Sequence, residues 1–202
     1  MRGDSCFDAI ASHFDTLVAK HGYHPCGCDY GDFSSQRLRF SILTQATDYS
    51  RKSVLDVGSG FGDFADYLKS HFSDVRYSGV DISREMVRMA RERHPGLNIR
   101  HVNILDEDPG HFDIVVAVGI FYLLGSNART LMRKIITRMF ELANETVAFS
   151  TLSARAPVRE PGEFFADPAD TFNFCQSLCE RVVLRHDYLR HDFTIYMYKS
   201  AR

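Results

Sequence analysis

The segment from Val54 to Phe64, VLDVGSGFGDF, holds the residue types whose spacing most clearly predicts chemistry. Its glycines, Gly58, Gly60 and Gly62, alternate with other residues, and a backbone without side chains can bend sharply and approach a ligand closely. Asp56 stands two residues before the first glycine, where an anion could meet a cationic ammonium group or orient a water molecule. This segment therefore predicts a ligand-binding turn.

Two further carboxylates narrow the class of ligand. A nicotinamide or flavin fingerprint has the form G-x-G-x-x-G, but this chain has Asp63 in place of the third glycine, and its charge would face a pyrophosphate unfavourably. Asp81 follows Gly58 by 23 residues, where a carboxylate can accept hydrogen bonds from both hydroxyls of a ribose. Together with Asp56, these positions favour a nucleoside that carries an ammonium group over a dinucleotide.

The elements that must position this turn alternate between short strands and helices from residue 53 onward, which is typical of parallel βαβ units. Strands are predicted at 53–57, 77–80, 99–102, 113–118 and 146–150, with helices near 62–72, 83–94 and 126–143. The runs 181–189 and 193–200 are separated by three residues. Because a parallel return needs a crossover of ~10 or more residues, these two runs must form an antiparallel hairpin.

Two segments lie outside this alternation. Near the N-terminus, apolar residues recur at helical spacing over 7–18, and residues 22–33 are predicted to form a loop. Ser34 or Ser35 is expected to cap a second helix. Residues 151–168 carry three prolines and a glycine, which predicts a long surface connection.

With these residues and elements together, the chain resembles the class I, seven-stranded S-adenosylmethionine (SAM) dependent methyltransferases over roughly residues 50 to 200. The resemblance implies an α/β fold: a Rossmann-like three-layer sandwich with a mostly parallel seven-stranded sheet of order 3-2-1-4-5-7-6, a C-terminal antiparallel hairpin and added N-terminal helices. It implies one domain over residues 1–202, in which 1–50 form an N-terminal helical lid or extension and 51–202 form the Rossmann-like core. It also implies SAM as the cofactor.

The resemblance assigns cofactor contacts residue by residue. The loop that holds the methionine part of SAM corresponds to Asp56, Gly58, Ser59, Gly60 and Gly62. Asp81 would hold the ribose, with Ile82 beside the adenine. The family usually offers an aspartate to the adenine amino group after its third strand, and here Asn103 has that place, followed by Ile104. An amide oxygen can still accept this bond, although turns also favour asparagine for local reasons.

The sulfonium of SAM makes its methyl carbon electrophilic, so the main task of such a protein is to align the acceptor with that carbon and to exclude water. The fourth strand ends in VGIFYLL, which would place Gly119, Phe121 and Tyr122 near the methyl group. Tyr122 could donate a hydrogen bond to the acceptor. Equally, Phe121 and Tyr122 could only cap the core.

Two other segments carry residues that could act on an acceptor. Residues 28–40 include Tyr30 and are interpreted as a lid that closes over SAM, while a solvated helix face is the alternative and is favoured for Arg39. The run RHDYLRHDF near the C-terminus holds two His-Asp pairs. Neighbouring residues of a strand point to opposite faces, and the second pair, His191-Asp192, lies in the turn, so a structural role is favoured.

Composition excludes several partners and sites. Lys and Arg number 24 against 26 Asp and Glu, a formal net charge of -2 without long runs of one sign, so neither nucleic acid nor an anionic membrane is expected as a partner. No signal peptide is recognisable and no apolar run approaches the ~20 residues of a spanning helix, which predicts a cytoplasmic protein. The five cysteines lack C-x-x-C spacing, so no metal is expected. No feature indicates an oligomeric state.

The sequence thus predicts an enzyme, a SAM-dependent methyltransferase that acts on a small-molecule acceptor by in-line methyl transfer. The same cofactor site would also serve an enzyme that catalyses an intramolecular displacement at the sulfonium of SAM and releases methylthioadenosine. A non-catalytic SAM-binding protein has less support, and Asp63 disfavours a nicotinamide oxidoreductase.

Overall fold

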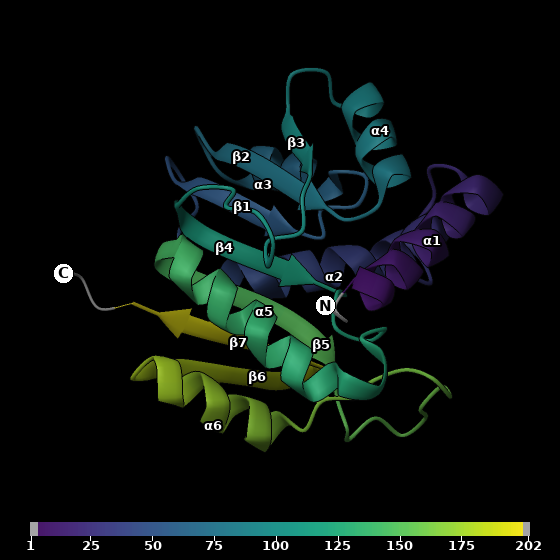
Figure 1. Cartoon of the computed structure of the whole chain (residues 1–202). Helices are drawn as coiled ribbons and strands as arrows, with labels where there is room; N and C mark the ends of the chain where they lie inside the picture. The colour runs from purple at the N-terminus through teal and green to yellow at the C-terminus, as the bar shows by residue number, and fades with distance from the viewer. Residues whose placement is uncertain (1–3, 200–202) are drawn as a thin grey trace.

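The computed structural model describes residues 4–199, which surround one seven-stranded sheet (Figure 1). The strands are β1 (Ser53–Val57), β2 (Arg76–Asp81), β3 (Asn98–His101), β4 (Phe112–Val118), β5 (Ala143–Leu152), β6 (Arg181–Leu189) and β7 (Asp192–Tyr198). Their order is β3-β2-β1-β4-β5-β7-β6. Strands β1 to β5 run parallel, and β7 is antiparallel to both β5 and β6. The predicted sheet order and C-terminal hairpin are confirmed.

Helices form a layer on each face of the sheet (Figure 1). One layer contains α2 (Phe33–Leu43), α3 (Asp63–His71) and α4 (Arg84–Arg93), and the other contains α5 (Ala128–Leu142) and α6 (Pro168–Leu178). The first helix, α1 (Asp4–His21), lies beyond the carboxyl ends of the parallel strands and contacts α4. Short 3-10 helices occupy Pro25–Cys28, Thr44–Ala46 and Gly125–Asn127. Across residues 4–199, no helix combines the length and apolar character that crossing a bilayer requires.

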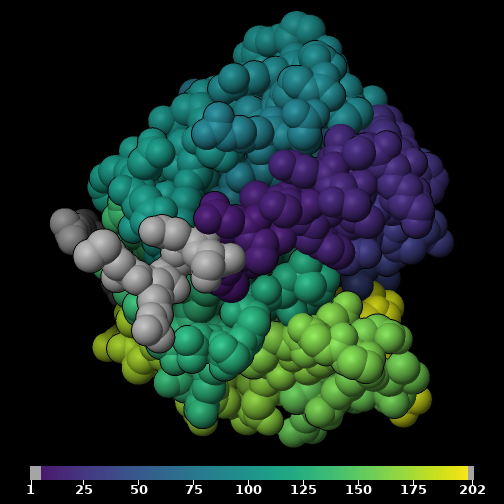
Figure 2. Space-filling model, turned by 45° about the vertical axis from the view of Figure 1, so that its right-hand side comes forward, coloured from purple at the N-terminus to yellow at the C-terminus, as the bar shows by residue number. Residues whose placement is uncertain are grey.

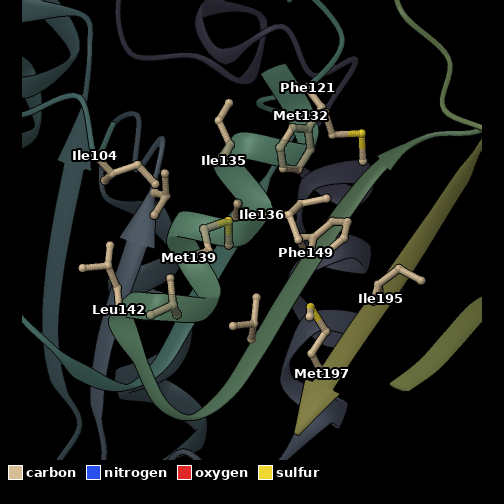
Figure 3. Close-up of a cluster of buried hydrophobic side chains, with 14 of the residues drawn as sticks. Ile104, Phe121, Met132, Ile135, Ile136, Met139, Leu142, Phe149, Ile195 and Met197 are labelled. Carbon is tan, nitrogen blue, oxygen red and sulfur yellow. The ribbon is translucent and has the colours of Figure 1, made fainter. Parts of the chain in front are cut away.

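The sheet separates two apolar clusters, because successive side chains of a strand point to opposite faces. In β4, Val115 belongs to the cluster under α5 and Ile114 to the cluster under α3. Figure 3 shows the first cluster, in which Met139 of α5 lies with Phe149 of β5 and Met197 of β7. The strands that carry the site at their ends are therefore held rigidly from both sides.

Local sequence signals account for most element boundaries. Ser83 caps α4, because its hydroxyl accepts a hydrogen bond from the backbone N–H of Met86. The cap of α2 is Asp32, whose carboxylate accepts from the N–H of Ser35 at 2.7 Å, so the expectation of a serine cap was wrong. The predicted strand at 193–200 begins one residue earlier and ends at Tyr198, and its last position lies outside the described residues.

Candidate functional site

The glycine turn lies between the carboxyl end of β1 and α3. Gly58, Gly60 and Gly62 have φ angles of 76°, 52° and 81°, in the left-handed region that favours glycine. A Cβ at Gly58 would collide with Cγ2 of Ile120, and a Cβ at Gly60 would lie 3.1 Å from Sγ of Cys28. The turn therefore requires glycine, and it brings bare backbone to the wall of a pocket.

Asp81 lies at the carboxyl end of β2, on the wall of the same pocket. Its Oδ2 accepts a hydrogen bond from the N–H of Gly60 at 2.9 Å, and its Oδ1 accepts from the N–H of Ser83 at 2.9 Å. Burial raises the pKa of this carboxyl, and hydrogen bonds from backbone N–H groups, those of Ser83 and Gly60 foremost, oppose the shift. The carboxylate is thus fixed in orientation, with lone pairs left for a ligand.

Asp56, just before the glycine turn, and Ser59, within it, are buried polar residues. The Tyr77 hydroxyl donates to Oδ2 of Asp56 at 2.7 Å, but burial dominates and raises the pKa of Asp56 to about 7. The Ser59 hydroxyl has no hydrogen-bond partner within residues 4–199. An unsatisfied buried hydroxyl and a buried carboxylate together indicate a polar, positively charged ligand.

The residues expected around an adenine also line the pocket. Ile82 and Ile104 supply apolar surface, and Asn103 follows β3 at the pocket edge. The Asn103 amide is used in a local turn, because its Oδ1 accepts from the N–H of Leu105 at 3.1 Å and its Nδ2 donates to Asp106 at 2.7 Å. The second lone pair of Oδ1 remains for a further donor.

The N-terminal segment covers this pocket. Phe7, Ile10 and Phe14 of α1 line it from above. Figure 2 shows the segment, in purple, between the teal part of the chain that contains α4 and the green loop that follows β5. The resemblance implied an N-terminal helical lid or extension over residues 1–50, and these three residues of that segment line the pocket.

Asp63 joins the glycine turn to the N-terminal segment. Its Oδ1 accepts from the Tyr23 hydroxyl at 2.8 Å, and its Oδ2 accepts from Nε2 of Gln36 at 3.2 Å. The guanidinium of Arg93 lies 4.0 Å from the same carboxylate and 3.1 Å from the Tyr23 ring centroid. From the sequence, this carboxylate only disfavoured a pyrophosphate, whereas in the structure it also anchors the N-terminal segment.

The three residues expected on the acceptor side have different surroundings. Phe121 is buried in the core, with its ring centroid 5.5 Å from that of Phe149, and its side chain does not line the pocket. Tyr122 lines the pocket, and its hydroxyl donates to Oδ2 of Asp29 at 2.7 Å. The structure thus places Phe121 as a core residue, as the alternative interpretation held, and Tyr122 at the pocket.

Tyr30 lies over the end of β4. Gly119 has a φ of 71°, and the Tyr30 hydroxyl is 3.5 Å from the position that a Cβ would take there. Within residues 4–199 this hydroxyl makes no hydrogen bond, although its ring is near Arg39. Tyr30 therefore presents an unengaged phenol hydroxyl to the pocket.

Arg39 is not part of a solvated helix face. Its side chain is 11% exposed, and its Nε donates to Oδ2 of Asp192 at 2.6 Å, with the Asp192 side chain 3% exposed. The expectation of a solvated Arg39 was wrong because the carboxylate of Asp192, which is distant in sequence and begins β7 rather than lying in the turn, is beside it. In the other His-Asp pair, Asp187 pairs with Arg185 on the hairpin surface.

Comparisons with known proteins agree with this geometry. A family model described as Methyltransferase domain matches residues 55–142. A Mycobacterium tuberculosis protein named as a putative methyltransferase is 28% identical over 74% of this chain and 94% of its own length. Trans-aconitate 2-methyltransferase of Rhodopseudomonas palustris is 32% identical over 52% of this chain and 42% of its own length, so the match spans less than half of that relative. This chain is a SAM-dependent methyltransferase with the class I fold.

Solved structures share the fold of this methyltransferase. A complex of DhpI with S-adenosylhomocysteine superposes with a TM-score of 0.72, covering 100% of both chains at 13% identity. A SAM-dependent methyltransferase of Aquifex aeolicus superposes with a TM-score of 0.66 at 17% identity, covering 93% of this chain and 97% of its own. At these identities the likeness concerns the fold alone.

The residues of the methyltransferase pocket fit SAM. Asp81 offers a fixed carboxylate for a ribose, and the bare backbone from Gly58 to Gly60 allows close approach. Asp56 offers a carboxylate for a cationic group, and the Ser59 hydroxyl, which has no partner within residues 4–199, can form a hydrogen bond to the ligand. When bound, SAM supplies an electrophilic methyl group.

Proposed function

We propose that this methyltransferase transfers the methyl group of SAM to a small-molecule acceptor by in-line displacement. The covered pocket carries the proposal. Helix α1 and residues 22–33 lie over the carboxyl edge of the sheet, and the bond from Tyr122 to Asp29 joins this cover to the loop after β4. A cover of this kind suits a small acceptor better than a nucleic acid, which the net charge of -2 also disfavours.

The cofactor contacts are proposed from the pocket walls. The methionine part of SAM would lie along the glycine turn, with its ribose on Asp81 and its adenine between Ile82 and Ile104 beside Asn103. Gly119 at the end of β4 would border the methyl group. The chain thereby orients the cofactor and excludes water, which are the main tasks in this reaction.

On the acceptor side, we assign different roles to the two tyrosines. Tyr30 has an unengaged hydroxyl in the pocket, so it is the residue proposed to contact the acceptor. The Tyr122 hydroxyl already donates to Asp29, so Tyr122 is proposed to keep the cover closed. Burial raises the pKa of the Tyr30 phenol, so Tyr30 acts as a neutral hydrogen-bonding group rather than as a phenolate base.

The name of one relative supports a small acceptor. That relative is named for trans-aconitate, which is a small molecule. The name belongs to the relative, and it supports the size class of the acceptor rather than its identity.

The test is a product analysis with purified protein, SAM and a panel of small acids, amines, phenols and thiols. The proposal predicts S-adenosylhomocysteine together with one methylated acceptor. Methylthioadenosine released in the absence of any acceptor would instead identify displacement within SAM. Bound SAM that stays intact across the whole panel would contradict methylation of a small molecule.

A further inference from the structure

We infer that Arg39, held by Asp192, is a positioning residue that fixes Tyr30 on the acceptor side of the pocket. The inference rests on the proposed function, in which the Tyr30 hydroxyl contacts the acceptor. It assigns a role in the reaction to two residues that lie behind the pocket wall.

The guanidinium of Arg39 is held on three sides. Its Nε donates to Oδ2 of Asp192 at 2.6 Å. Its Nη1 donates to the backbone oxygen of Ser35 at 3.1 Å and to the Ser35 hydroxyl at 2.6 Å, and its Nη2 lies 3.4 Å from Nε2 of His191. An exposed ion pair would sample many geometries, whereas this one is largely shielded from solvent, with the Arg39 and Asp192 side chains 11% and 3% exposed.

This fixed cation lies against the Tyr30 ring. The distance from Cζ of Arg39 to the ring centroid is 5.6 Å, within the range of a cation–π contact. The backbone of Tyr30 is held separately, because its N–H donates to the oxygen of Pro25 at 3.0 Å. With ring and backbone both held, the hydroxyl stays above Gly119.

The C-terminal hairpin supplies the support for Arg39. Asp192 is the first residue of β7 and pairs with Leu152 at the end of β5, so its position is set by the sheet. The same hairpin contacts α2 again where the Tyr196 hydroxyl donates to the oxygen of Ile42 at 2.5 Å. Burial raises the pKa of Asp192 to about 6, so the carboxylate is mostly ionised at neutral pH and pairs with Arg39.

A buried charge pair contributes little net stability to the contact between two elements, because apolar residues of similar volume often stabilise a protein as well or better. The pair at Arg39 and Asp192 is placed where it contacts a pocket tyrosine. A role in the reaction explains why the pair lies next to Tyr30 rather than elsewhere along α2.

The first test is a double-mutant cycle between this pair and the Tyr30 hydroxyl. The pair is neutralised together, as Arg39→Gln with Asp192→Asn, so that neither charge is left buried alone. With an acceptor from the panel, we expect kcat to fall roughly tenfold while the Kd for SAM stays within about twofold. In a Tyr30→Phe background the same neutralised pair should lower kcat by less than about twofold, because the group that it positions is already gone.

The matched control neutralises a more exposed pair on the same hairpin, Arg185→Gln with Asp187→Asn, whose side chains are 27% and 63% exposed, and should leave kcat unchanged. The inference would be overturned if the neutralised Arg39 pair lowered kcat by the same factor in the Tyr30→Phe background as in the wild type. Such independent effects would show that Arg39 does not act through the Tyr30 hydroxyl. An equal loss of SAM affinity would overturn it as well.

The second test does not depend on turnover. With 3-fluorotyrosine at position 30, the fluorine resonance reports on the ring, and neutralising the Arg39 pair should move and broaden that resonance while the control pair leaves it in place. An unchanged resonance overturns the inference even if the wild type methylates an acceptor. A shifted resonance in a protein that methylates nothing on the panel supports the positioning and contradicts only the proposed function.

Discussion

Asp56 and Asp81 are buried carboxylates at the ends of neighbouring strands, but different groups hold them. Two backbone N–H groups donate to Asp81, whereas the only hydrogen bond to the Asp56 carboxylate from residues 4–199 comes from the Tyr77 hydroxyl. Burial consequently dominates at Asp56 and raises its pKa to about 7. Asp81 is therefore suited to be a fixed acceptor, and Asp56 is the carboxyl that titrates near neutral pH.

Replacement of Asp81 with asparagine should weaken SAM binding. The amide offers one acceptor oxygen where the carboxylate offers two, so a backbone N–H and a ribose hydroxyl would compete for it. We expect the Kd for SAM to rise roughly 10- to 100-fold, as for loss of a charged hydrogen bond. Calorimetry checks this, with Asp74→Asn as the exposed control, and an unchanged Kd would contradict the assignment.

The raised pKa of Asp56 predicts that SAM binding releases a proton. The folded chain keeps the Asp56 proton up to about pH 7, while the unfolded chain loses it near 4, so this group contributes less stability as pH rises through that window. A cationic ligand favours the ionised form. Binding near pH 6 should therefore expel the proton, and affinity should increase as pH approaches 7.

Calorimetric titration of SAM at pH 6, in two buffers with different ionisation enthalpies, measures this release. The wild type should show a buffer-dependent enthalpy, and the Asp56→Asn variant should show a smaller dependence together with weaker binding. The same buffer dependence in both proteins would show that Asp56 does not titrate on binding.

Among the elements, residues 22–33 and the loop after β4 are joined by the hydrogen bond from Tyr122 to Asp29. Tyr122→Phe removes this bond and leaves the ring. We expect a loss of about 1 kcal/mol in the stability of the closed cover and faster amide hydrogen exchange over 22–33. Tyr67→Phe, in α3, is the control, since the Tyr67 hydroxyl takes no part in the contact between residues 22–33 and the loop after β4. Unaltered exchange in the Tyr122 variant would contradict a closing role.

Elements with local signals were predictable from the sequence. The alternation of short strands with helices predicted β1 to β5, whose central strands are buried on both faces. The three-residue gap between the last two runs predicted the hairpin, because a parallel return needs a longer crossover. The glycine turn with Asp56 and Asp81 was predictable because all three lie on consecutive βα units. The bond between Asp29 and Tyr122 was not, because 93 residues separate them.

The environment of Arg39 was unpredictable for the same reason. Its partner Asp192 is 153 residues away, and no helical periodicity in α2 signals a buried arginine. Phe121 illustrates a different limit. It follows β4 closely, and only the packing against Phe149 places its ring in the core rather than in the pocket.

For the whole molecule, SAM should act as a stabiliser, because its pocket is built from β1, β2, β4 and the N-terminal segment together. At a SAM concentration of 100 times Kd the expected stabilisation is about 2.7 kcal/mol. A protein of this size should then show a rise in Tm of roughly 5 to 10 °C. Thermal unfolding monitored by circular dichroism checks this, and an equal rise with a dinucleotide would contradict a SAM-specific pocket.

The most direct test of the whole account is calorimetric titration of the purified, folded protein with SAM, S-adenosylhomocysteine and NAD in parallel. The account predicts that SAM and S-adenosylhomocysteine each bind to one site per chain, while NAD gives no binding signal. Binding of NAD with no uptake of either SAM or S-adenosylhomocysteine would contradict it.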